Sequence, residues 1–432
     1  MNIDRRFTLL CLALATLVTF RGQAFAEYDK ILVGTCSYKN LAHFPTIQQA
    51  VNSSPPGTTV FVCPGTYPEQ VVINQQLILE GILISNQNAV VIKPPASGLV
   101  QNATDFDNGG NPIAAQILVQ GPFAGTVLIS NITVDGTGNG ISGCALDLRG
   151  ILFQNASGTL GHVTVQNEVP GDTLGVCQTG GEAIFVQTST GSSTVAIGGT
   201  SVHNYNTNGV TGNDAGTKLT LTTNYIQGSG LVAGAPVQNG IQLGLGAKGT
   251  LTGNTVIDNS NPGSAGILLY DTAENSGTTV GGNTVVNSPS PIALKADGAS
   301  SPNYGDGVTV TGNRIFGSAI NDAIDVCTNG NTISKNTIFN TAESAIHLDA
   351  SCGVNAGIAA TGNGNSVTQN TITNSACAGI LDDNSGGGDT NTNSPNTYYA
   401  VPFQVTGSTS SCFAVAREKG RAKAARTFHA VR

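Results

Sequence analysis

Tryptophan is absent from this chain of 432 residues, and charged and aromatic residues are scarce, at 10% and 5%. The Leu, Glu and Lys residues that long helices need are also few, so a mainly helical protein with one thick core is excluded. In their place the chain has 56 glycines and many Asn, Thr and Ser residues. This composition favours many short strands joined by tight turns.

A long apolar run is missing after residue 26, which argues against a membrane-spanning helix. Residues 1–26 are typical of an export signal, because Arg5 and Arg6 precede an apolar stretch and Ala24-Phe25-Ala26 resembles a cleavage site. The sequence therefore predicts a signal peptide over residues 1–26 and a protein that is secreted, periplasmic or held at the cell surface. We expect a single domain over residues 27–416, and a monomer.

Positive charge is also scarce, since the formal net charge is −8. An acidic surface repels nucleic acid, and it repels acidic polysaccharides unless a cation such as calcium bridges the two. Neutral glycans meet no such barrier. Residues 417–432 form a basic tail that we expect to be disordered or to form a short surface helix.

Calcium is the cofactor that the sequence offers, on limited grounds. The stretch DFDNGGN (105–111) resembles the start of a calcium loop but lacks the later glutamate, and DDNSGGGDTNTN (382–393) is rich in oxygen ligands. Both stretches are equally typical of ordinary Asp/Asn/Gly turns. Which residues would hold a metal stays open.

Eight cysteines remain once Cys11 leaves with the signal, an even number for an exported protein. Sequential pairing would join residues that are 25 to 35 positions apart, close to the length of the repeat described next. Unpaired buried thiols are the alternative. Sequential pairing would give Cys36–Cys63, Cys144–Cys177, Cys327–Cys352 and Cys377–Cys412, but the sequence leaves the connectivity open.

Two short patterns alternate along the chain. One contains an Asn before Thr or Arg and an apolar residue, as in GNTVIDN at 253 and KNTIFNT at 335. The other reads small-Ile-x-apolar, as in GIQL at 240, AIDV at 323 and AIHL at 345. A period of roughly 23–34 residues with short strands indicates a parallel β-solenoid. The recurring Asn is interpreted as a stacked turn residue that bonds to its neighbours, not as a ligand.

The beginning of the mature chain fits a cap for this solenoid. Residues 44–54 place Ile47 and Val51 four apart after Pro45 and a candidate N-cap, Thr46, so a short helix is predicted. The stretch TIQQAVNSSPPGTTVFVCPGTYPEQVVI, followed by the repeats, resembles the right-handed parallel β-helix superfamily with its pectin-lyase-like fold. The resemblance covers roughly residues 40 to 400 and implies an all-β, single-stranded right-handed parallel β-helix with an N-terminal capping helix.

Aligning the small-Ile-x-apolar copies creates two columns of outward residues, because alternate residues of a strand point to opposite faces. The first column is predicted to contain Asp147, Phe185, Gln242, Leu268, Ala293, Asp325, His347 and Leu381. The second column is predicted to contain Arg149, Gln187, Gly244, Tyr270, Lys295, Cys327, Asp349 and Asp383. Asp325 and His347 should therefore be neighbours on consecutive turns.

This grouping defines a candidate site. A carboxylate beside a histidine suits general acid or base catalysis, so Asp322, Asp325, His347 and Asp349 are the candidate catalytic residues. Tyr270, Lys295 and Glu343 are the candidate substrate-binding residues. The alternative is that Asp325 and His347 are a solvated pair on the outside of a solenoid.

The resemblance leaves the chemistry open. NDAIDV (321–326) is similar to the catalytic strand of polygalacturonases, with Asp322 at the first acid, but Ala323 replaces the second. Pectate lyases use an arginine base, and Arg149 and Arg314 are the only arginines between residues 27 and 416. We therefore expect an exported β-helix protein that binds a polysaccharide or a surface partner. A polysaccharide lyase or glycoside hydrolase that acts on pectin-like or other glycans is the alternative.

Overall fold

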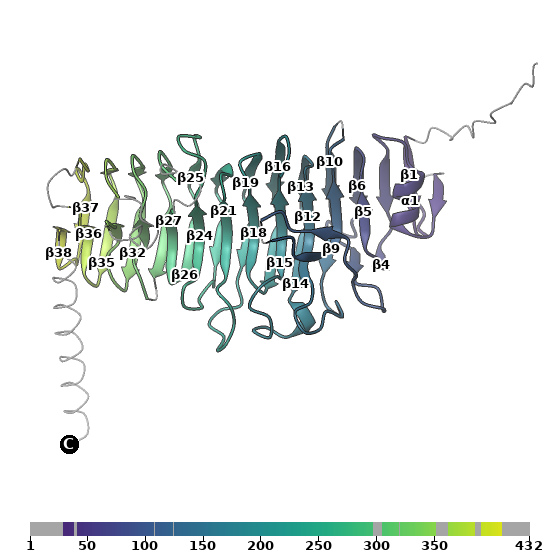
Figure 1. Ribbon diagram of the computed structural model, residues 1–432, viewed down its shortest axis with the longest axis horizontal. Coiled ribbons are helices and arrows are strands. Elements are labelled where there is room, and N and C mark those ends of the chain that lie inside the picture. Colours follow the sequence, from purple (N-terminus) through teal and green to yellow (C-terminus); the bar gives the residue numbers. More distant parts are fainter. Residues whose placement is uncertain are drawn as a thin grey trace, which may run out of the picture.

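The computed structural model describes residues 29–38, 41–107, 109–123, 125–296, 305–318, 320–350, 362–384 and 390–407. In this part of the chain, three long sheets run side by side along a rod, with the N-terminal strands at one end and the C-terminal strands at the other (Figure 1). Most turns contribute one strand to each sheet, and almost every strand pair is parallel. The exception is the antiparallel pair β8–β9.

The sheets are named A, B and C. Sheet A contains β1 (Lys30–Val33), β2 (Ala42–Phe44), β3 (Thr59–Val62), β6 (Leu77–Gly81), β10 (Val127–Ser130), β13 (Gly158–Gly161), β16 (Ser193–Gly198), β19 (Thr217–Thr222), β22 (Lys248–Thr252), β25 (Thr279–Gly281), β28 (Thr309–Thr311), β31 (Thr332–Ser334) and β34 (Ser366–Thr368). Sheet B contains β4 (Gly65–Pro68), β7 (Val90–Lys93), β11 (Thr133–Asp135), β14 (Thr164–Glu168), β17 (Ser201–Tyr205), β20 (Tyr225–Gln227), β23 (Thr255–Ile257), β26 (Thr284–Ser288), β29 (Arg314–Ser318), β32 (Thr337–Thr341), β35 (Thr371–Ser375) and β37 (Thr397–Tyr399).

Sheet C carries the small-Ile-x-apolar strands. It contains β5 (Val71–Ile73), β8 (Ala103–Thr104), β9 (Pro112–Gln120), β12 (Asp147–Gln154), β15 (Glu182–Gln187), β18 (Asn208–Asn213), β21 (Asn239–Gly244), β24 (Ala265–Tyr270), β27 (Ser290–Lys295), β30 (Ile324–Val326), β33 (Ile346–Leu348), β36 (Ala378–Asp382) and β38 (Phe403–Thr406). A one-turn 3-10 helix, η1 (Pro170–Asp172), lies in the connection from β14 to β15.

Stacked aliphatic side chains fill the interior of the coil. In sheet C the isoleucines of the repeat, such as Ile292, Ile324 and Ile346, pair in register and are fully buried. Each such side chain contributes about 1.5–3 kcal/mol by burial. The period of two along each strand therefore fixes which residues face outward.

The small residue of the repeat marks the corner between sheets B and C. A Cβ added at Gly240 or Gly266 would come within 2.3 or 2.4 Å of a methyl group of Val256 or Val285. Because these valines belong to β23 and β26 of sheet B, a larger residue would push the two sheets apart. The first residue of the pattern is therefore small because the corner has no room for a larger side chain.

The recurring asparagines form the predicted ladder at the corner between sheets A and B. Asn254, Asn283 and Asn313 are fully buried, and Asn283 Oδ1 accepts hydrogen bonds from both the backbone N–H and Nδ2 of Asn254, each at 2.9 Å. The residue before each has positive φ, as at Gly253 with 65°, which favours glycine. The ladder satisfies buried backbone groups on every turn.

The N-terminal cap is confirmed as α1 (Ile47–Ser53), shorter than the predicted 44–54 because Phe44 belongs to β2. The Thr46 side chain accepts a hydrogen bond from the Gln49 N–H, as expected for an N-cap. The carboxylate of Glu69 accepts two more of the helix's free N–H groups, those of Ile47 and Gln48. The buried side chains Ile47, Ala50 and Val51 join the interior core.

The disulfides Cys36–Cys63 and Cys144–Cys177 form as predicted, with sulfur–sulfur distances of 2.05 and 2.10 Å. Cys327 and Cys377 are also disulfide-bonded. Their predicted partners, Cys352 and Cys412, lie outside the described residues, as do the predicted signal peptide and the basic tail. Among the described residues, no helix has the length and apolar character that crossing a membrane requires.

Candidate functional site on the outer face of sheet C

Asp325 and His347 occupy the same outward position on consecutive turns, as the sequence predicts. Asp325 pairs with His347 in the register of β30 and β33, while Ile324 and Val326 point into the core. The register continues to Ala293 on one side and Leu381 on the other, which confirms this part of the first column. Both side chains are mostly buried by their neighbours, with exposed fractions of 14% and 12%.

His347 lies between two carboxylates from different turns. Its Nδ1 is 3.0 Å from Asp322 Oδ2, and its Nε2 is 3.4 Å from Asp383 Oδ2. The remaining oxygens of both acids accept backbone hydrogen bonds, since Ser344 N–H donates to Asp322 Oδ1 and Ala350 N–H to Asp383 Oδ1, each at 2.7 Å. These bonds hold the ring in one orientation.

The protonation of His347 follows from this setting. Burial lowers the pKa of the ring, but the hydrogen bonds to Asp322 and Asp383 outweigh it and raise the pKa to about 10. Although burial opposes the change, the bond to His347 keeps the pKa of Asp383 below its usual value. At neutral pH the histidine is therefore an imidazolium, which is the wrong form for a general base.

Asp325 forms an ion pair with Lys295 on the preceding turn. Burial raises the pKa of Asp325, the lysine opposes that change, and Asp322 adds to it. The lysine side chain is 31% exposed, so solvent weakens the pair. Lys295 also pairs in register with Tyr270, which is half-buried on the turn before.

The two other predicted residues lie beside this group. Asp349 follows His347 by two residues and is half-buried, and its carboxylate is within 4.8 Å of the ligand atoms of His347 and Asp383. The Glu343 residue is exposed overall, but its carboxyl group is partly buried. This burial, followed by the charge of Asp322, raises the pKa of the carboxyl. We call Lys295, Asp322, Asp325, His347, Asp349 and Asp383 the histidine cluster.

The two predicted columns of outward residues are wrong at their N-terminal end. Leu152 pairs with Phe185 and Gln154 with Gln187, so these residues stand where the sequence prediction placed Asp147 and Arg149. The copy ALDL at 145 is out of register, and the true copy is GILF at 150–153. Gly150 fits the crowded corner, because a Cβ there would lie 2.6 Å from a methyl group of Val165.

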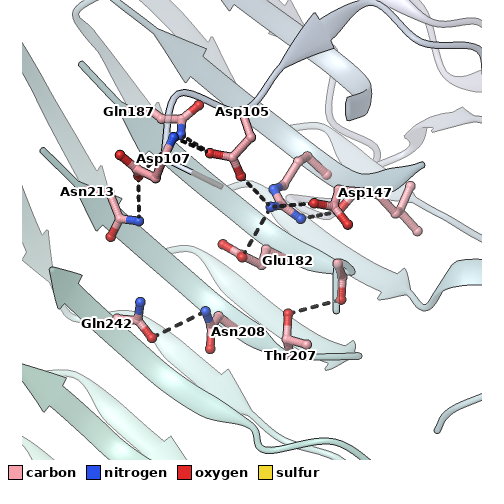
Figure 2. Close-up of polar contacts among 12 residues, drawn as sticks. Asp105, Asp107, Asp147, Glu182, Gln187, Thr207, Asn208, Asn213 and Gln242 are labelled. Atoms are coloured by element: carbon pink, nitrogen blue, oxygen red, sulfur yellow. Dashed lines mark hydrogen bonds and ion pairs between the residues drawn. The ribbon is translucent and has the colours of Figure 1, made fainter. Parts of the chain in front are cut away.

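Arg149 is the centre of a second group that the sequence did not reveal. Its side chain is 2% exposed, and its Nη2 lies 3.4 Å from Glu182, 3.7 Å from Asp105 and 3.9 Å from Asp147 (Figure 2). The guanidinium carbon also lies 4.9 Å from the centre of the Phe185 ring. Burial raises the pKa of Glu182 and of Asp147, and Arg149 opposes both changes. We call these four charged residues the arginine cluster.

A crossover segment covers the arginine cluster. This roof segment consists of residues 101–111, of which the structure describes all but residue 108. Asp105 Oδ1 accepts a hydrogen bond from Gln187 Nε2 at 2.7 Å, and Asp107 Oδ2 accepts one from Asn213 Nδ2 at 3.1 Å (Figure 2). Ala103 of this segment packs with the outward side chains Leu118, Leu152 and Phe185 of sheet C.

The two acid-rich stretches proposed for calcium have other partners in the described residues. Asp105 and Asp107 contact Arg149, Gln187 and Asn213, and the Asp382 carboxylate accepts hydrogen bonds from Asn391 and Asn393. Calcium binding there stays a prediction. The groups of described residues that could share a metal ion both lie in or beside the histidine cluster.

Amide side chains line the strands between the two clusters. Asn239 Nδ2 donates to Gln242 Oε1 at 3.1 Å and to Asn208 Oδ1 at 3.2 Å. Strand β18 adds Thr211 and Asn213, which the sequence columns omitted because its copy, GVTG, has Val in place of Ile. With β12 and β30 six strands apart, the two clusters are separated by roughly 29 Å along the rod.

No protein-family model matches the chain, and no curated protein matches it in sequence. Among solved structures, the chain is similar to GH136 lacto-N-biosidase from Eubacterium ramulus, at 11% identity and a TM-score of 0.54, over 86% of this chain and 68% of that one. It also matches the family 28 exopolygalacturonase of Yersinia enterocolitica, at 11% identity and a TM-score of 0.49, over 83% of this chain and 73% of that one.

A third similar structure is the A-module of the mannuronan C-5 epimerase AlgE4 from Azotobacter vinelandii, at 14% identity and a TM-score of 0.44, over 83% of this chain and 91% of that one. At such identities the likeness concerns the fold alone. The three long parallel sheets, together with the likeness to the GH136 lacto-N-biosidase, show that the fold is a right-handed parallel β-helix of the pectin-lyase-like type, as the sequence predicted.

Proposed function

We propose that this protein is exported and binds a glycan along the outer face of sheet C. The observation that carries the proposal is the strip of polar side chains on the outer face between the arginine and histidine clusters, which the apolar Leu268 and Ala293 border on β24 and β27. Asn208, Asn239 and Gln242 belong to adjacent strands of this strip and bond to one another. A linear ligand that follows the rod axis would meet new polar groups on every turn.

The chemistry of the strip suits sugar hydroxyl groups. Amide side chains offer both donors and acceptors, which is what a hydroxyl needs from its partner. Tyr270, half-buried at the edge of the strip, offers an aromatic face together with a polar tip. The similar structures include proteins named for glycan-processing activities, which fits this class of ligand.

The charge of the face favours neutral over acidic glycans. The net charge of the chain is −8, and the histidine cluster holds four aspartates beside one lysine and one histidine. Lys295 is already paired with Asp325, so it is poorly placed to neutralise a uronate. Repulsion between like charges then opposes binding of a polyuronate.

Calorimetry with the purified mature protein tests the proposal. Neutral oligosaccharides from xylan and β-glucan are titrated in parallel with oligogalacturonate and oligoalginate, without divalent cations. Tyr270→Ala and Gln242→Ala should each weaken binding of the preferred neutral glycan about tenfold, which corresponds to about 1.4 kcal/mol.

Tyr225→Ala is the matched control, because Tyr225 is an exposed tyrosine of β20 on sheet B. Its affinity should equal that of the wild-type protein. Equal losses in the Tyr225 and Tyr270 variants would place the glycan elsewhere, and the absence of binding across the panel would refute the proposal.

Catalysis on the same face is the second candidate, favoured by the raised pKa of Asp325 next to His347. A raised pKa brings a carboxyl closer to the range in which it can act as a general acid on a glycosidic oxygen. The same panel is followed by reducing-end release and by ultraviolet absorbance of unsaturated uronates. Turnover that disappears in Asp325→Asn would identify an enzyme, and unchanged substrates would leave a binding protein.

A further inference from the structure

We infer that His347, Asp349 and Asp383 form a binding site for a divalent transition-metal ion, with zinc as the preferred ion. His347 lies on β33, Asp349 directly follows that strand, and Asp383 directly follows β36. Leu348 pairs with Asp382, so Asp349 and Asp383 occupy equivalent positions on consecutive turns. One ligand atom from each of the three side chains lies within 4.8 Å of the other two.

The distance between two of these ligand atoms already suits zinc. Tetrahedral zinc with bonds of about 2.1 Å keeps its ligand atoms roughly 3.4 Å apart. His347 Nε2 and Asp383 Oδ2 are 3.4 Å apart. The Asp349 carboxylate needs only a side-chain rotation or a small shift to complete the group.

The histidine is oriented as metal-binding histidines usually are. Its Nδ1 lies 3.0 Å from Asp322 Oδ2, and Asp322 is itself fixed by the Ser344 N–H at 2.7 Å. Such a carboxylate holds the Nδ1 proton and directs Nε2 toward the metal. On binding, Nε2 donates its lone pair to the ion and its proton passes to solvent, so Asp322 is a positioning residue and not a ligand.

The type and number of ligands distinguish zinc from calcium. Calcium requires six to eight oxygen ligands and does not select imidazole. One imidazole and two carboxylates suit zinc and leave a fourth position for water or for a ligand hydroxyl group. A second group, Asp325, Cys327 and Asp349, is excluded because Cys327 is disulfide-bonded and has no thiolate to offer.

The local charge also favours a cation. Asp322, Asp325, Asp349 and Asp383 face the cluster from three turns, whereas Lys295 is the cation paired with Asp325. His347 and Asp383 are 12% and 17% exposed and Asp349 is half-buried, so the group keeps partial contact with solvent. A divalent ion would replace one proton and reduce the remaining excess of negative charge.

The test is calorimetry with untagged mature protein that has been stripped with EDTA. Titration with zinc chloride should show one site, with tighter binding than a parallel titration with calcium chloride. His347→Ala and Asp383→Asn should abolish this binding, and Asp322→Asn should weaken it about 10- to 100-fold. His203→Ala, which removes a histidine of β17 on sheet B, should bind zinc as the wild-type protein does.

Circular dichroism and melting temperature verify that each variant is folded. If His347→Ala does not fold, the conservative Asp383→Asn change still tests the site. Three results would overturn the inference: no zinc binding by the wild-type protein at millimolar concentration, full binding by the folded ligand variants, or a preference for calcium. The measurement contains no glycan, so its failure leaves the proposed function untouched, and failure of the glycan titration leaves the metal site untouched.

Discussion

The arginine and histidine clusters lie on the same face of the same sheet and differ in what covers them. The roof segment covers Arg149, whose side chain is 2% exposed, and three carboxylates from separate turns surround it. Lys295 is 31% exposed, and each of the two carboxylates beside His347 is held by the ring and by one backbone N–H group. The acids of the two clusters are similarly buried, so the clusters differ mainly in their cations, of which Arg149 is enclosed and Lys295 is partly exposed.

This difference shows why similar ionic residues have different roles. A buried ion cluster is stabilising only as a complete set, because removing one member leaves the others desolvated and unpaired. A partly exposed cluster keeps access to water and tolerates the loss of a member. We therefore expect the arginine cluster to hold the roof segment in place and the histidine cluster to bind ligands.

The largest expected effect is that of Arg149→Met. It leaves Asp105, Asp147 and Glu182 without their cation, which should lower the free energy of unfolding by about 3–5 kcal/mol. Lys295→Met, the matched change in the histidine cluster, should cost no more than about 1 kcal/mol. Urea denaturation followed by circular dichroism measures both, and equal losses would remove the distinction between the clusters.

The next effect concerns an acid packed behind the arginine cluster. Glu168 is fully buried, its carboxylate oxygens accept no hydrogen bond in the described structure, and a Cβ on Gly150 would come within 2.8 Å of it. Burial, and then the charge of Asp135, raise the pKa of Glu168 well above its usual value. The folded protein therefore holds a proton that the unfolded chain releases.

The sign of the pH dependence follows. The stabilisation that the Glu168 proton contributes is complete below the usual glutamate pKa. It falls by about 1.4 kcal/mol per pH unit as the pH rises toward the raised pKa. Glu168→Gln should match the wild-type protein near pH 4 and be more stable at pH 8. Denaturation at both pH values measures this, and parallel losses in the two proteins would contradict it.

The smallest effect concerns the roof segment. Burial, and then the neighbouring Asp107, raise the pKa of Asp214 to about 7. The stabilisation from the shared proton is complete below the usual aspartate pKa and is lost as the pH rises to about 7. Because Asp214 is half-buried, we expect a loss of at most about 1–2 kcal/mol.

Limited proteolysis of the roof segment at pH 6 and pH 8 tests this effect. The wild-type segment should be cleaved faster at pH 8, after correction for protease activity. Asp214→Asn keeps a hydrogen-bonding side chain without the charge and should remove the difference. An unchanged pH difference in that variant would show that another group controls the segment.

The candidate site was predictable where the repeat is regular. AIDV and AIHL have the same length and corner residue, so their alignment gave the Asp325–His347 pair directly. The alignment failed at β12 (Asp147–Gln154), because ALDL at 145–148 overlaps the start of this strand while GILF at 150–153 lies within it. Only the corner at Gly150, crowded by Val165 of sheet B, selects the second copy.

The sequence by itself determined the fold, the capping helix and the asparagine ladder, and it suggested the pairing of Cys36 with Cys63 and Cys144 with Cys177 that the structure shows. These features depend on patterns that recur within one or two turns of the coil, where chain spacing translates directly into stacking. The tertiary structure decided which charges meet. Asp105 reaches Arg149 only through the crossover, and Asp322 and Asp383 meet at His347 only because their turns stack in register.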